Sequence, residues 1–199
     1  MADAFTMRSY VYIDNMQPQF AAYVGATVQG DVPVAGMAEL WIEVAPANQA
    51  FRLMDVALKA ADVRPATQYI EREFGLLEVH SYDQSAVQAA AEAILDRTGL
   101  TIQDAVSPRI ASSEVITNID PYQAQLINKM RRGSLLVIEV EPAAYVSLAA
   151  NESEKAADIQ QVYVSNVGRF GRLYQSGSES EVLAARDAAV AAIEAVAAV

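Results

Sequence analysis

The sequence contains no cysteine and a single histidine among its 199 residues. Without thiols, the chain can form neither a disulfide framework nor a cysteine-based metal site, and it has no cysteine nucleophile. His80 has no serine and acid placed to complete a catalytic triad, so we interpret it as a packing or surface residue at a strand end. No phosphate-binding loop, dinucleotide fingerprint or metal-ligand cluster occurs. The sequence therefore predicts a protein that is not an enzyme and that needs no cofactor or metal.

Basic residues are also scarce. Fourteen Lys and Arg stand against 25 Asp and Glu, which gives a formal net charge of −11. A field of this sign repels phosphate backbones, so we expect no nucleic-acid partner. The one basic cluster, Lys129-Met130-Arg131-Arg132, precedes Gly133, and we interpret it as a helix end, where cations compensate the helix dipole.

Long apolar runs do not occur either. No stretch approaches the roughly 18 consecutive apolar residues that would cross a bilayer, and the N-terminal residues lack the basic and apolar regions of a secretion signal. We therefore expect a cytoplasmic protein without a membrane partner. Hydrophobic residues nevertheless make up 53% of the chain, which is enough for a packed core.

What the chain does contain is an internal repeat. Residues 40–64 and 136–160, which are 136 − 40 = 96 positions apart, share ten identities in 25, where composition alone predicts about two. Upstream, Gly30 corresponds to Gly133 at an offset of 103, so the first copy carries 103 − 96 = 7 additional residues around 31–37. Two homologous domains, 1–104 and 105–199, are the simplest explanation.

Each copy alternates strand-like and helix-like patterns. In the first copy, strands are predicted at 9–14, 39–45, 67–70 and 74–80, and helices at 18–28, 47–61 and 84–97. The second copy repeats this order and ends in an alanine-rich helix at 181–198. Trp41 is predicted to lie in the core, as is the apolar face of helix 47–61, formed by Ala50, Leu53, Met54, Ala57, Leu58 and Ala61. Helices on one side of a mainly antiparallel sheet make an α+β sandwich of ferredoxin-like character.

These residues resemble the bacterial microcompartment shell domain. In that family a strand ending in a Val-Glu-like pair precedes a helix of small residues and a Lys-Ala-Ala-Asn/Asp-Val motif, which Lys59–Val63 and Lys155–Ile159 match. The order of elements, together with the stretch Arg8–Asp14 followed by Gln17-Pro18-Gln19, is similar to that of the circularly permuted tandem members. The resemblance covers almost the whole chain and both of its halves.

The resemblance implies a structural role. Three chains would form a homotrimer whose six domains make a pseudo-hexameric tile, set among hexameric shell proteins in the wall of a microcompartment. A gated central pore would pass metabolites or cofactors. Two such trimers stack face to face in some members and enclose a chamber.

The resemblance also assigns site residues. The turns Glu71-Arg72-Glu73 and Val167-Gly168-Arg169 would point to the threefold axis, with Glu71 and Arg72 as the gate pair. Oppositely charged side chains from neighbouring subunits would pair to close the pore and rotate away to open it. Arg169 would add positive charge that favours anionic metabolites. Lys59 and Lys155 would lie at the tile edge.

Other interpretations stay open at this stage. From the residues alone, Glu71-Arg72 is a solvent-exposed hairpin and Arg169 is a surface arginine outside any pore. Lys59 and Lys155 are then helix-end cations. A trimeric ferredoxin-like regulatory protein that binds small molecules between subunits is an alternative from a different functional class. A third is an enzyme whose site is assembled between the two repeats.

Overall fold

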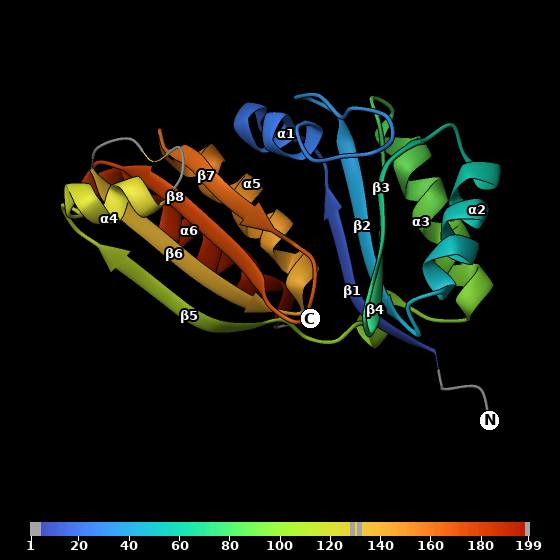
Figure 1. The fold of residues 1–199 in the computed structure, drawn as a ribbon. Coiled ribbons are helices and arrows are strands. Elements are labelled where there is room, and N and C mark those ends of the chain that lie inside the picture. Colours follow the sequence, from blue (N-terminus) through green and yellow to red (C-terminus); the bar gives the residue numbers. More distant parts are fainter. Residues whose placement is uncertain (1–4, 128–129, 131–132, 198–199) are drawn as a thin grey trace. The chain divides into compact units, whose positions relative to one another are not determined.

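The computed structural model describes residues 5–127, 130 and 133–197. The chain divides into two compact units, Met1–Ser107 and Pro108–Val199, and each is an antiparallel four-stranded sheet with helices (Figure 1). Of the basic cluster, Lys129, Arg131 and Arg132 lie outside the described residues, and the helix expected to end there ends at Leu126.

The first unit runs β1 (Thr6–Ile13), α1 (Pro18–Gly25), β2 (Ala38–Ala45), α2 (Gln49–Ala60), β3 (Arg64–Glu71), β4 (Phe74–Ser81), α3 (Gln84–Thr98) and the short turn η1 (Ile102–Asp104). The strand order is β1-β2-β4-β3, and every neighbouring pair is antiparallel. If β1 is counted after α3, this is the order of a β-α-β-β-α-β ferredoxin-like sheet. The chain therefore has the permuted connectivity that the sequence predicted.

The second unit repeats this architecture. Its elements are β5 (Arg109–Ile116), α4 (Pro121–Leu126), β6 (Ser134–Glu141), the short turn η2 (Ala143–Tyr145), α5 (Val146–Ala156), β7 (Gln160–Ser165), β8 (Gly171–Gly177) and α6 (Glu179–Ala197). The order β5-β6-β8-β7 is the same as in the first sheet. The predicted α+β fold with two homologous halves is therefore confirmed.

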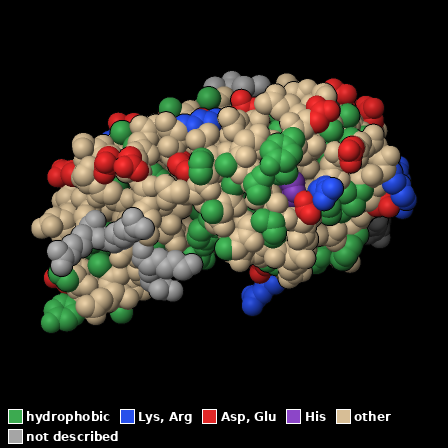
Figure 2. Space-filling model, turned by 90° about the horizontal axis from the view of Figure 1, so that it is seen from above, with side chains coloured by type: hydrophobic (Ala, Val, Ile, Leu, Met, Phe, Trp, Pro, Cys, Tyr) green, Lys and Arg blue, Asp and Glu red, His purple; other side chains and the backbone are tan. Residues whose placement is uncertain are grey.

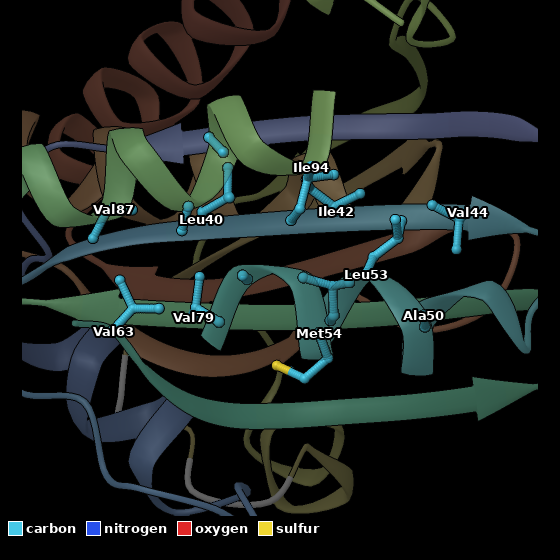
Figure 3. Close-up of a cluster of buried hydrophobic side chains, with 14 of the residues drawn as sticks. Leu40, Ile42, Val44, Ala50, Leu53, Met54, Val63, Val79, Val87 and Ile94 are labelled. Atoms are coloured by element: carbon cyan, nitrogen blue, oxygen red, sulfur yellow. The ribbon is translucent and has the colours of Figure 1, made fainter. Parts of the chain in front are cut away.

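The core of the first unit lies between the sheet and helices α2 and α3 (Figure 3). Side chains of a strand alternate between the two faces, so Leu40, Ile42 and Val44 point to the helices while Trp41 points to the other face, where it is also buried. Leu58 contradicts the prediction, because it is 40% exposed. Its position is one residue past Ala57, which turns it about 100° away from the narrow stripe that α2 buries.

Several element boundaries differ from those predicted. The strand expected at 67–70 begins at Arg64, because Pro65 lies on an edge strand next to a bulge, where the missing N–H costs no ladder bond. The backbone N–H groups of Gly30 and Asp31 then bond to the carbonyls of Ala66 and Pro65, so the segment with the seven extra residues adds to this edge. The helix expected to reach Val28 ends at Gly25.

A pair of equivalent glycines fixes where each sheet meets the loop before its first core helix. A Cβ on Gly75 would lie 2.0 Å from the carbonyl oxygen of Ala47, and one on Gly171 would lie 2.2 Å from that of Ala143. The two contacts are related by the same offset, 143 − 47 = 96 and 171 − 75 = 96. The duplication therefore preserves a backbone approach that a side chain would prevent.

We expect Gly75→Ala and Gly171→Ala each to lower the free energy of unfolding by about 1–3 kcal/mol, because the clash is with backbone that cannot rotate away. Chemical denaturation of each variant measures this loss. Gly177→Ala is the matched control, since its Cβ would first meet the side-chain oxygen of Glu181 at 3.1 Å, which can move. Equal stability of all three variants would contradict the assignment.

Candidate functional site

The first candidate turn is a tight hairpin between β3 and β4. Glu71 pairs with Phe74 in the strand register, so only Arg72 and Glu73 form the connection, and both are exposed. Two-residue hairpin loops favour turn types with positive φ. Asn118 is the non-glycine residue with positive φ in the described chain, so neither Arg72 nor Glu73 adopts that conformation. This turn therefore lacks the positive φ angles of the favoured two-residue hairpin turns.

The first turn carries three charged side chains, Glu71, Arg72 and Glu73. Among the described residues, none forms an ion pair with Glu71, Arg72 or Glu73. Acidic side chains are spread over the face of the molecule shown in Figure 2, in keeping with the net charge of −11. The turn thus places an exposed arginine between two glutamates, available to contact another chain.

The second candidate turn is wider and its arginine is held. It spans 166–170, with Gly168 at φ 95°, a conformation that favours glycine. Arg169 Nε donates to Glu141 Oε1 at 2.8 Å, and Arg109 donates to the other carboxylate oxygen at 2.6 Å. These two arginines lower the pKa of Glu141 below its ordinary value. The cluster therefore carries two positive charges against one negative charge.

The two predicted edge lysines occupy equivalent positions in the last turns of α2 and α5. Lys59 Nζ lies 2.7 Å from Asp55 Oδ2, and Lys155 Nζ lies 2.7 Å from Glu152 Oε1. Their side chains differ in exposure, at 75% for Lys59 and 33% for Lys155. Both positions suit a cation near a helix C-terminus, as well as a contact at an edge.

Sequence reasoning missed a cluster of charges buried on the sheet face that points away from α2 and α3. Glu78 accepts hydrogen bonds from the backbone N–H of Ala66 at 2.7 Å and from His80 Nδ1 at 2.9 Å. The other ring nitrogen, Nε2, lies 3.3 Å from Asp31 Oδ2. Because a carboxylate faces each ring nitrogen, only the imidazolium can donate to both. Burial lowers the pKa of His80, but Glu78 and Asp31 outweigh burial, so the pKa is raised overall.

Glu39 lies directly opposite His80 in the β2–β4 register and is fully buried. Burial and the neighbouring Glu78 carboxylate raise its pKa well above the ordinary value, although the indole of Trp41 opposes the shift. Burial likewise raises the pKa of Glu78, against the hydrogen bond and charge of His80. Folding therefore shifts Glu39 toward its protonated form relative to the unfolded chain.

The second unit has no counterpart of this cluster. The positions equivalent to Glu39, Glu78 and His80 at the offset of 96 are Leu135, Tyr174 and Ser176, and Asp31 lies in the segment that is longer in the first copy. A comparison of the two repeats for positions where a charge replaces a neutral residue could have found the cluster. His80 is accordingly a buried, paired residue and not a surface residue.

Across the described chain, no helix is long and apolar enough to cross a membrane. Nor does any group of three or more His, Asp or Glu residues there have the geometry to hold a metal ion.

The buried cluster makes stability depend on pH. A raised His80 pKa contributes stability that is complete below about pH 6.5 and is lost as pH rises through the folded-state value. The raised pKa values of Glu39 and Glu78 act in the same direction, because the folded state favours their protonated forms. We therefore expect the thermal unfolding temperature of the first unit to fall between pH 6 and pH 9.

Glu39→Leu, which copies Leu135, should reduce this slope and add about 1–4 kcal/mol at pH 8, because it removes a buried acid and leaves the Glu78–His80 pair intact. Thermal unfolding at several pH values measures both effects. Glu194→Gln, at an exposed position of α6, is the control and should leave the slope unchanged. A Glu39→Leu variant with the wild-type pH dependence would contradict the prediction.

Comparison with known proteins agrees with the fold and its permutation. The family model of the CsoS1D N-terminal domain matches residues 7–104. The carboxysome shell protein CcmP of Synechococcus elongatus is 51% identical over 195 residues, covering 94% of this chain and 92% of that protein. The carboxysome shell protein CsoS1D of Hydrogenovibrio crunogenus is 40% identical over 94% of this chain and 96% of its own.

Solved structures match over both units. The fused permuted hexameric shell protein MSM0275 from the RMM microcompartment superposes with a TM-score of 0.94 at 43% identity, covering 96% of this chain and 98% of that chain. The double ringed trimeric shell protein MSM0271 from the same microcompartment gives a TM-score of 0.92 at 38% identity, covering 97% and 98%. The alternative of a small-molecule regulator is not favoured by these relatives. The chain belongs to the family of permuted tandem-domain microcompartment shell proteins that includes CcmP and CsoS1D.

Proposed function

We propose that three copies of this chain form a tile in the shell of a bacterial microcompartment, with a gated pore on the threefold axis. The observation that carries the proposal is the repeated unit, since three chains with two homologous domains each supply six nearly equivalent segments around one axis. Close similarity to shell proteins over both units supports the role of a structural wall component. The Glu71–Glu73 and Val167–Arg169 turns are the segments that the proposal places at the pore.

The charges of the first turn suit a gate. Around a threefold axis, Glu71 and Arg72 of neighbouring subunits would alternate in sign and pair across the opening. Exposed ion pairs of this kind contribute only about 0–1 kcal/mol each. A closed and an open arrangement would therefore differ by a few kcal/mol at most, which permits both to be populated.

The second turn would set the charge of the opening. Arg169 and Arg109 both bind the Glu141 carboxylate, so this cluster has a net charge of 2 − 1 = +1 in each subunit. Three such clusters would offset part of the acidic surface and favour anionic metabolites in the pore. Because Glu141 holds Arg169 in place, we expect this charge to remain fixed while the first turn moves.

The edges of the tile would carry Lys59 and Lys155, which meet neighbouring hexameric shell proteins. Lys59 is the more exposed of the two, so the first unit offers the more accessible cation at its edge. A stacked pair of trimers is the further assembly that we propose, by similarity to the relative described as double ringed and trimeric.

The solution mass tests the threefold axis. Light scattering on a sizing column should give three times the chain mass of 21.4 kDa for a trimer, and six times that mass for a stacked pair. A monomer or dimer at shell-forming concentrations would remove the axis and, with it, the pore.

Charge removal tests the gate. The double variant Glu71→Ala and Arg72→Ala should keep the wild-type mass but raise the conductance of the assembly in a planar bilayer, because no charge pairs remain to close the opening. The matched control is the double variant Glu92→Ala with Arg97→Ala, which removes one acid and one base from exposed positions of α3. Unchanged conductance in the gate variant, or loss of its trimer, would show that the two residues do not form a gate.

A further inference from the structure

The base of the first turn is tied to a strand that is not its neighbour. Phe74 closes the hairpin as the partner of Glu71, and the guanidinium carbon of Arg8 lies 3.6 Å from the centre of its ring. Arg8 belongs to β1, whereas Phe74 belongs to β4, and β2 lies between these strands. A cation stacked at this distance on an aromatic face is attracted by the ring quadrupole.

Arg8 is itself fixed from the intervening strand. Its Nε lies 3.3 Å from Glu43 Oε2 on β2, and the two side chains are 16% and 1% exposed. One terminal nitrogen of Arg8 is buried without a hydrogen-bond partner in the described part of the chain. The guanidinium is therefore clamped between the carboxylate and the ring.

The carboxylate side of this clamp tolerates the loss of its partner. Burial raises the pKa of Glu43 to about 7, while the Arg8 guanidinium acts to lower it. Without Arg8, the carboxyl can take up a proton and stay buried as a neutral group. Variants at position 8 are therefore expected to fold.

The second unit provides a built-in comparison. The residue equivalent to Glu43 is Glu139, which pairs with Arg172 of β8 at 2.7 Å. The ring equivalent to Phe74 is Phe170, whose cation is its sequence neighbour Arg169, at 5.2 Å from the ring centre. The side chains of Arg169 and Arg172 are 68% and 43% exposed, whereas that of Arg8 is mostly buried. Arg169 of the second turn is held by Glu141, which also binds Arg109 of β5. No described cation–π contact links the ring of Phe170 to β5.

We propose that Arg8 is a positioning residue for the gate, which holds Phe74 and so fixes the base on which Glu71 and Arg72 move. This inference rests on the proposed gate. The stacked contact and the exposed gate pairs are of comparable strength, so loss of the contact shifts the balance between turn positions without preventing either one. Residues 71–73 then move as a short unit hinged at a fixed ring.

The test compares Arg8→Ala, Arg8→Lys, Phe74→Leu and the double variant Arg8→Ala with Phe74→Leu, all as the assembled full-length protein. Hydrogen exchange of the peptide that contains residues 70–75 reports the opening of the turn, and bilayer conductance reports the gate. We expect Arg8→Ala to speed exchange and to raise the open fraction by about 2- to 30-fold. Phe74→Leu should do the same, and the double variant should add little to either single change.

Arg8→Lys should show a smaller effect than Arg8→Ala, because it keeps a cation over the ring but loses the planar stacking. Arg172→Ala, which removes the equivalent pair of the second unit, is the control and should leave exchange at residues 70–75 unchanged. Wild-type exchange in Arg8→Ala, additive effects in the double variant, or faster exchange without a change in conductance would each overturn the role of Arg8. Failure of the gate itself is distinct, since it would appear as wild-type conductance in Glu71→Ala with Arg72→Ala.

Discussion

Pairing of β2 with β4 at the centre of the first sheet is the interaction on which the other features depend. The ladder runs from Ala38 opposite Ser81 to Val44 opposite Gly75, and it joins segments that are far apart in the chain. One face of these strands buries the apolar core against α2 and α3. The other face carries Glu39 and His80 at one end, and Glu43 beside Arg8 at the opposite end.

Duplication followed by divergence gives one chain two kinds of turn. The cores of the two units are equivalent down to the backbone approach of Gly75 and Gly171. Their other faces and turns differ. The first turn has two residues between its strands, and its charges have no ion-pair partner among the described residues. The second turn is wider and holds Arg169 on Glu141. A ring of identical single domains would have six copies of one turn. A trimer of this chain, as proposed, would instead combine three copies of each of two different turns.

Exposed and buried contacts are divided along the first hairpin. Exposed charges at its tip interact weakly in water and are easily exchanged, whereas the base is pinned by a desolvated stack and by the tight packing of Gly75. The gate movement that we propose would therefore involve only a few residues. The inserted segment lies at the far end of the sheet, where Asp31 contacts His80, and it has no equivalent in the second unit.

The sequence by itself determined the duplication, the order of strands and helices, the α+β class and the position of the two turns, because periodicity and repeated motifs are local properties of the chain. The resemblance to shell proteins, which rests on the same local motifs, supplied the family. Only the tertiary structure decided that Leu58 faces solvent, that Glu39, Glu78 and His80 share a buried face, and that Arg8 reaches Phe74. A period of two says which side chains share a face of a strand, but pairing between distant strands decides which faces are covered and which charges meet.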